Sequence, residues 1–219
     1  MRRQARPAAL AAVALALART AAAATGAVAA PLDYELPAAG SYELPVIQRV
    51  SDHALVSSDG TEARLLPADG ARITAVAFVY LHCTDAAGCP LALAELQRVD
   101  RALAERPELR GRLRLVTVSF DPERDDPAAL ASLRGRLAPR SDWRFLTARD
   151  AAQLAPVLRD FGQDAVPELT ADGTDSGVVR HVVKVFLVDP QGGVRNIYST
   201  GFLDHRLLLR DVETLLLRE

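Results

Sequence analysis

The apolar run at residues 73–82, "ITAVAFVYLH", is the feature that most constrains the fold of this chain. Its continuity is typical of a strand that is buried on both faces of a sheet. An amphipathic segment follows at residues 90–105 and places Leu96, Val99 and Leu103 on one helical face. Pro90 suits the first turn of that helix. A buried strand followed by a covering helix predicts an α/β domain.

Strand and helix patterns alternate along the rest of the chain. A hairpin is predicted at 53–66, where apolar residues lie on both sides of Asp59-Gly60. Asp204 is a candidate N-cap for the last helix. The other predicted strands are 113–120, 143–147, 181–189 and 194–200, and the other helices are 127–137, 150–162 and 203–219. With two cysteines after the first core strand, this order predicts a thioredoxin-like, three-layer α/β/α fold with a central mixed sheet and an N-terminal β-hairpin.

Three parts are predicted along the chain. Residues 1–29 contain four arginines, an apolar stretch and several small-residue cleavage sites, as in a signal peptide, with an uncleaved membrane anchor as the alternative. Residues 30–46 are proline-rich and are expected to form an extended linker, and residues 47–219 form the domain. We therefore expect export to the periplasm or to the outer face of the inner membrane, where a disulfide can persist.

The charge of the chain argues against a nucleic-acid partner. The net charge is -2, and removal of the first thirty residues, which hold four arginines and no acid, leaves -6. A mildly acidic domain without a basic stripe lacks the electrostatic footprint of a nucleic-acid binder. We expect a monomer.

The only two cysteines, Cys83 and Cys89, lie between the buried strand and the predicted helix. Three interpretations are open: a structural disulfide, a redox couple and two arms of a metal site. A disulfide across so short a loop would stabilise the fold by about 2–3 kcal/mol. Cys89 begins the helix, where unpaired N–H groups favour a thiolate. A redox function requires such a low thiol pKa, and we expect it at Cys89.

A metal site requires a third ligand, and four histidines are available. His53 precedes the first hairpin, His205 is expected on the surface of the last helix, and His82 should point to the opposite side of its strand from Cys83. His181 remains, at the start of a predicted strand. A lone histidine there is more often structural, but in a thioredoxin-like fold this position lies against the cysteine loop. Two thiolates and one imidazole suit copper, as Cu(I) or Cu(II).

The string "VSFDPERDDP" at 118–127 adds a second signature. With "VSDHALVSSDGTEARL" before it and "WRFLT" and "FLVDPQGGV" after it, the order of motifs resembles the Sco/SenC family of copper proteins over residues 47–219. The resemblance implies copper ligands at Cys83, Cys89 and His181. It also implies an exported, membrane-tethered metallochaperone whose client is a copper protein such as subunit II of cytochrome oxidase. The alternative function is thiol–disulfide reduction of an exported copper or cytochrome protein.

The chain departs from the family pattern at two places. The cysteines have the spacing C-x5-C rather than C-x3-C, and Arg180 stands before the histidine where aspartate is usual. An arginine disfavours a nearby cation. We assign the Asp121–Asp125 string a role in shaping its loop and no ligand role. The polar segment 172–177, "DGTDSG", is expected to form a loop that flaps over the site. The ligand that we expect to be released first is Cys83.

Overall fold

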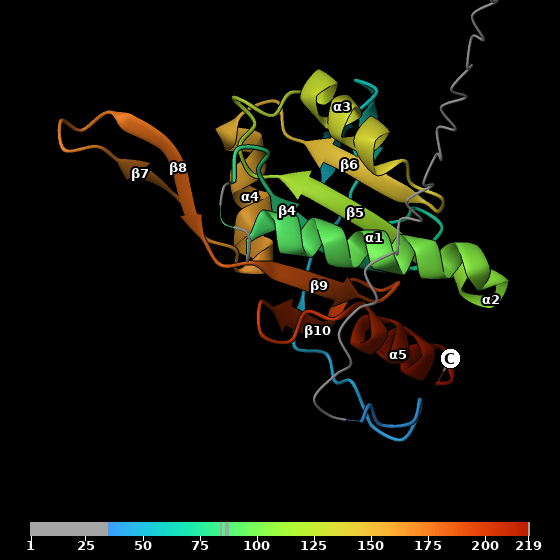
Figure 1. Cartoon of the computed structure of the whole chain (residues 1–219). Helices are drawn as coiled ribbons and strands as arrows, with labels where there is room; N and C mark the ends of the chain where they lie inside the picture. Colours follow the sequence, from blue (N-terminus) through green and yellow to red (C-terminus); the bar gives the residue numbers. More distant parts are fainter. Residues whose placement is uncertain (1–34, 84, 86–87, 219) are drawn as a thin grey trace, which may run out of the picture. The chain divides into compact units, whose positions relative to one another are not determined.

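A mixed eight-stranded sheet forms the centre of the part of the chain that this computed structural model describes, residues 35–83, 85 and 88–218 (Figure 1). The strand order is β1-β10-β9-β4-β5-β6-β2-β3, with β4, β5 and β6 parallel and the other pairs antiparallel. The strands are β1 Gln48–Arg49, β2 Ala54–Ser57, β3 Glu62–Arg64, β4 Ile73–Val79, β5 Leu113–Ser119, β6 Trp143–Thr147, β7 Ala165–Leu169, β8 Asp175–His181, β9 Lys184–Val188 and β10 Gly193–Ser199. The helices are α1 Cys89–Glu105, α2 Pro107–Arg110, α3 Pro127–Leu137, α4 Ala151–Phe161 and α5 His205–Leu216.

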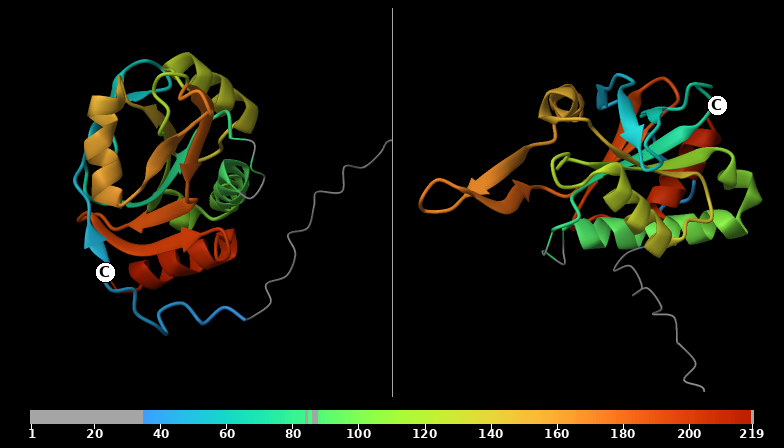
Figure 2. Two further views of the ribbon diagram at one scale, coloured as in Figure 1. Left: turned by 90° about the vertical axis from the view of Figure 1, so that its left-hand side faces the viewer. Right: turned by 90° about the horizontal axis from the view of Figure 1, so that it is seen from above.

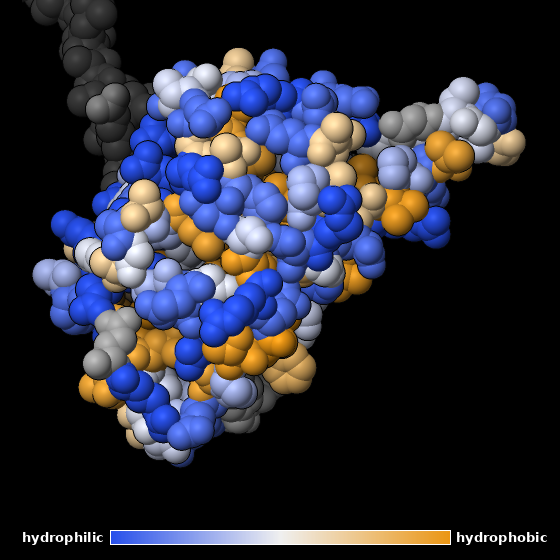
Figure 3. Space-filling view, turned by 180° about the vertical axis from the view of Figure 1, so that it is seen from behind, coloured by the Kyte–Doolittle hydropathy of each residue, from blue (hydrophilic) through white to orange (hydrophobic). Residues whose placement is uncertain are grey.

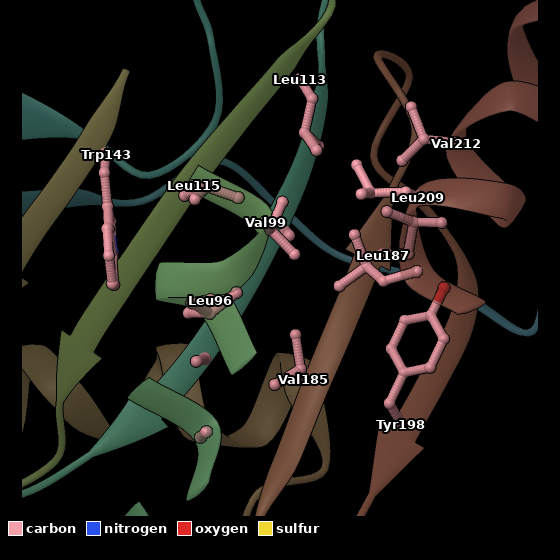
Figure 4. Packing of buried hydrophobic residues seen from close by; sticks show 14 of the residues in the cluster. Leu96, Val99, Leu113, Leu115, Trp143, Val185, Leu187, Tyr198, Leu209 and Val212 are labelled. Carbon is pink, nitrogen blue, oxygen red and sulfur yellow. The ribbon is translucent and has the colours of Figure 1, made fainter. Parts of the chain in front are cut away.

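Both faces of this sheet are covered. Alternate residues of β4 enter two different cores: Ala75 and Ala77 pack toward α1, α3 and α5, while Val76 and Phe78 pack toward α4. Figure 4 shows Leu96 and Val99 of α1 among the buried side chains of the sheet and α5. Burial on both sides explains why β4 is continuously apolar. The predicted three-layer fold with a mixed sheet is confirmed.

Several local predictions are also confirmed. Leu96, Val99 and Leu103 are all fully buried on α1. The turn between β2 and β3 has Gly60 at φ +83°, a conformation that glycine adopts without steric cost. The Asp204 carboxylate accepts a hydrogen bond from the backbone N–H of Arg206 and caps α5. Capping and turn chemistry are therefore encoded locally.

Strands β7 and β8 form a separate two-stranded hairpin that projects from the main sheet (Figures 1 and 2). The prediction of one strand over 181–189 was wrong, because β8 ends at His181 and β9 begins at Lys184. The loop expected at 172–177 was also wrong, since these residues form the hairpin turn and the first part of β8. Most hairpin side chains are exposed, so the segment lacks the apolar pattern that would have predicted strands.

The segment from residue 36 to residue 46 contains no helix or strand, yet it lies on the domain. Leu44 is buried, the Tyr42 hydroxyl donates a hydrogen bond to Asp211 of α5, and the Gly40 N–H donates to the Thr214 hydroxyl. The predicted signal peptide at 1–29 lies outside the described residues. Within the ranges that are described, no helix is long and apolar enough to cross a membrane.

Candidate metal centre

Cys89 is fixed by the junction between β4 and α1. It is the first residue of α1, Pro90 follows it in the first turn, and its side chain is 1% exposed. Gly88 occupies the N-cap position and provides no side-chain cap. The sulfur of Cys89 is therefore held at the helix start, beyond the carboxyl end of a central parallel strand, where open α/β sheets place their sites.

Cys83 lies in the loop before α1 and is only partly buried. The Cys83 N–H donates to the Tyr80 carbonyl at 3.3 Å, and the Cys83 sulfur lies 3.9 Å from the Asp85 carbonyl oxygen. A Cβ atom added to Gly88 would lie 3.1 Å from the Cys83 sulfur and 3.0 Å from the Asp85 carbonyl. Because Gly88 has no side chain, the Cys83 sulfur has room to lie beside it.

His181 completes the group from the end of β8. Its Nε2 lies 3.4 Å from the Cys89 sulfur, and its Nδ1 lies 2.9 Å from the Val179 carbonyl oxygen. Because a carbonyl only accepts hydrogen bonds, Nδ1 carries the proton of the neutral ring and Nε2 keeps its lone pair. The nitrogen that faces Cys89 is therefore the one that can bind a metal.

Two aromatic rings fix the orientation of the His181 imidazole. Tyr80, directly after β4, meets it edge to face with 5.5 Å between ring centroids, and Phe120, directly after β5, lies at 4.8 Å. Both aromatic side chains are buried. The sequence interpretation missed these two residues, because no signal in the sequence separates an aromatic at a strand end from an ordinary core residue.

The ligand atoms of Cys83, Cys89 and His181 all lie within 4.8 Å of one another. No other group of three histidine, cysteine or acidic residues with this spacing occurs in the described ranges. His82 is exposed and outside the group, as expected. His53 pairs with Asp160 at 2.8 Å. His205 is not on the open surface as predicted, because its Nδ1 lies 2.9 Å from the Glu95 carboxylate and its side chain is 17% exposed.

The expectation of a low thiol pKa at Cys89 was wrong for the metal-free protein. Burial, together with the neighbouring Cys83, raises the pKa of Cys89 to about 12, against a smaller lowering by a hydrogen bond with the Tyr80 backbone. The loss of hydration therefore raises the thiol pKa of Cys89 more than the helix N-terminus lowers it. A thiol that is protonated in this way becomes a thiolate only when a partner stabilises its charge, as a bound metal ion does.

The Asp121–Asp125 turn supports the chain segment that leads to the cysteine loop. Asp125 is fully buried, and its carboxylate accepts hydrogen bonds from the Ser119 hydroxyl at 2.6 Å and from the Leu81 N–H at 3.0 Å. Burial raises the pKa of Asp125. Because Leu81 lies two residues before Cys83, these contacts agree with the loop-shaping role expected for the string.

Comparison with known proteins identifies the family. The SCO1/SenC family model matches residues 47–217. The chain belongs to the SCO1/SenC family. Two mitochondrial relatives, the SCO2 homologue proteins of Mus musculus and Homo sapiens, are each 30% identical over 122 residues, which is 56% of this chain. The matched region spans 45% and 43% of those two proteins, less than half of their length.

Solved structures of SCO1/SenC proteins share the fold. Arabidopsis thaliana ScoI with copper bound has a TM-score of 0.63 at 20% identity, covering 78% of this chain and 99% of that one. A family lipoprotein from Bacillus anthracis has a TM-score of 0.64 at 20% identity, covering 78% and 97%. BsSco, a member of a family of cytochrome c oxidase assembly proteins described with a disulfide switch, has a TM-score of 0.59 at 20% identity, covering 78% and 94%.

The structure shows where the two departures from the family pattern, the C-x5-C spacing and Arg180, lie relative to the cysteine–histidine group. The longer C-x5-C loop still brings Cys83 next to Cys89, with Gly88 providing the room. Arg180 is exposed and stands opposite Val166 in the hairpin, one residue before His181. Its side chain therefore belongs to the face of β8 opposite to that of His181.

Proposed function

We propose that this protein is a copper metallochaperone that holds one copper ion through Cys83, Cys89 and His181. The single observation that carries the proposal is the convergence of two sulfurs and one imidazole nitrogen within 4.8 Å. Soft thiolates select Cu(I), and imidazole binds copper in both oxidation states. The structure of a related protein with copper bound supports the same cargo.

The three proposed ligands differ in how firmly they are held, which suits both binding and release of the ion. Cys89 is buried at a helix start, and His181 is fixed by the Val179 carbonyl and two rings. Cys83 is more exposed and lies in a loop. A client thiolate can therefore displace Cys83 first, while Cys89 and His181 retain the ion until the exchange is complete.

The proposed client is a copper protein of the cytochrome oxidase type, with subunit II as the candidate. The oxidase assembly role described for the BsSco family supports this choice. Export agrees with the lipoprotein and mitochondrial relatives. We therefore also propose the division into a signal or anchor at 1–29, a linker at 30–46 that lies on the domain from residue 36 onward, and a domain at 47–219, acting in the periplasm or at the outer face of the inner membrane.

The alternative is thiol–disulfide exchange, favoured by the adjacent sulfurs and by the disulfide switch described for BsSco. In that reaction the two thiols of Cys83 and Cys89 give up two electrons and two protons and form a disulfide. The client's disulfide takes them up and becomes two thiols. The high pKa that burial gives Cys89 disfavours it as the attacking group at neutral pH.

Anaerobic Cu(I) titration of the reduced protein, with a chromophoric competitor, tests the proposal. We expect about one Cu(I) per chain, loss of binding in Cys83→Ser and Cys89→Ser, and affinity lowered by about 10-fold or more in His181→Ala. His82→Ala is the matched control, because His82 is exposed beside Cys83 and outside the group. Full affinity in His181→Ala, or equal loss in His82→Ala, would contradict the assignment.

A further inference from the structure

Arg124 belongs to the Asp121–Asp125 turn, and its side chain reaches the hairpin that carries His181. Its Nε is 2.8 Å from a carboxylate oxygen of Asp121. The Asp121 side chain is 7% exposed, and its backbone N–H donates to the Ser119 hydroxyl at 3.0 Å. Asp121 is therefore held in place just after β5, and its ion pair with Arg124 places the guanidinium group at the edge of the main domain.

The other side of the guanidinium group meets the backbone of β8 at Gly177. A Cβ atom added to Gly177 would lie 2.8 Å from the Arg124 Nη1, so a larger residue at this position would displace the guanidinium group. Gly177 has φ +79°, and the register of the hairpin shifts between Pro167 and Leu169, opposite this residue. The strand thus bulges at the position where Arg124 contacts it.

The other contacts of the hairpin with the domain lie near its base, where Val179 is buried and His181 packs against Tyr80 and Phe120. Strands β7 and β8 pair with each other and have no ladder to the main sheet. A cleft separates the hairpin from α4, with Leu158 on one side, Pro167 and Val179 on the other, and Arg124 at its border. Figure 3 shows the hairpin from behind as an arm that extends beyond the body of the domain. Its orientation must therefore depend on a few contacts near its base.

We propose that Arg124 is a positioning residue that holds β8 so that His181 faces Cys89. Gly177 precedes His181 by four residues on the same strand, and Val179, whose carbonyl binds the imidazole, lies between them. A change of the contact at Gly177 is thus transmitted along a short extended segment to the ring. The inference rests on the proposed function only where copper is concerned, since the arrangement of the metal-free hairpin is a separate property.

Amide hydrogen exchange of the metal-free protein tests the contact directly. We expect exchange of the amides at 178–181 to be faster by about 10-fold in Arg124→Gln and in Gly177→Ala, because each change opens the same contact from one side. Arg149→Gln is the matched control, since Arg149 pairs with Glu62 on an exposed surface. Unchanged exchange in both Arg124→Gln and Gly177→Ala would overturn the proposal.

A double-mutant cycle with Cu(I) shows whether the effect passes through His181. Arg124→Gln should lower Cu(I) affinity by about 10-fold, as changes in the partners of metal ligands do. In the His181→Ala background the same change should have no further effect. An equal loss in that background would overturn the positioning role. If the unaltered protein binds no Cu(I), the copper proposal fails, and the exchange experiment alone decides the role of Arg124.

Discussion

At the scale of single residues, the three proposed ligands are held with different firmness. Cys89 is 1% exposed and begins a helix, and His181 is oriented by a carbonyl and two aromatic rings. Cys83 depends on a loop whose close packing requires a glycine at 88. The position of Cys83 should therefore be the most sensitive of the three to small changes nearby.

Gly88→Ala tests this dependence. The new Cβ would lie 3.1 Å from the Cys83 sulfur and 3.0 Å from the Asp85 carbonyl, so the loop must move. We expect Cu(I) affinity to fall by about 10-fold while the fold is retained. Competitive Cu(I) titration measures the effect, with Gly201→Ala as the control because a Cβ there meets nothing within 4 Å. Unchanged affinity in Gly88→Ala would show that the loop adapts freely.

The sequence predicted the three residues that the structure brings together, but it did not predict their setting. Cysteine spacing and the elimination of other histidines led to Cys83, Cys89 and His181. Tyr80 and Phe120 were hidden, because an aromatic at a strand end is indistinguishable in sequence from an ordinary core residue. The raised pKa of Cys89 was missed because it depends on burial, which is a property of the assembled fold.

At the scale of elements, prediction succeeded where at least one face of an element is buried. Strands β4 and β5 and helices α1 and α3 lie where apolar periodicity placed them. The β7–β8 hairpin was not predicted, because Val166, Leu169 and Val178 are largely exposed. Pairing between the two strands, rather than a shared core, defines this hairpin. His181 was consequently placed at the start of a strand, although it ends one.

The ends of α3 and α4 allow a test in which two substitutions should change the stability of the protein in opposite directions. Ala138 ends α3 at φ +46°, and Gly162 ends α4 at φ +55°, both in the left-handed region and both exposed. Ala138→Gly should stabilise the protein by roughly 0.5–1 kcal/mol, since alanine is strained there. Gly162→Ala should destabilise it by about 1 kcal/mol for the same reason. Urea unfolding measures both free energies of unfolding. A change of the same sign in the two variants would contradict the explanation from the left-handed backbone conformation.

At the scale of the whole domain, the proposed site and the N-terminal segment are attached to different parts of the fold. The site lies at the carboxyl ends of β4 and β5, beside the hairpin. Residues 36–46 contact β10 and α5 instead, and Figure 1 shows this segment beside those two elements. Its central contact is the Asp211 carboxylate, which is fully buried and accepts hydrogen bonds from Tyr42, Tyr198 and Asn196.

Tyr42→Phe should therefore affect stability and leave copper binding alone. Loss of one hydrogen bond to a buried carboxylate should lower the free energy of unfolding by about 1–2 kcal/mol at neutral pH, measured with urea. Burial and the bond to Asp211 raise the pKa of Tyr42 to about 12. The neutral phenol is thus favoured by folding, and this stability should be lost as pH rises from about 10 to 12.

Tyr42→Phe should lack that part of the alkaline loss, so the two unfolding free energies should converge as pH approaches 12. Cu(I) affinity at neutral pH should be the same in both proteins, because Tyr42 contacts α5 and no member of the cysteine–histidine group. His181→Ala is the converse control, with weakened copper binding and nearly unchanged stability. A fall in copper affinity in Tyr42→Phe would mean that the two attachments are coupled through the sheet.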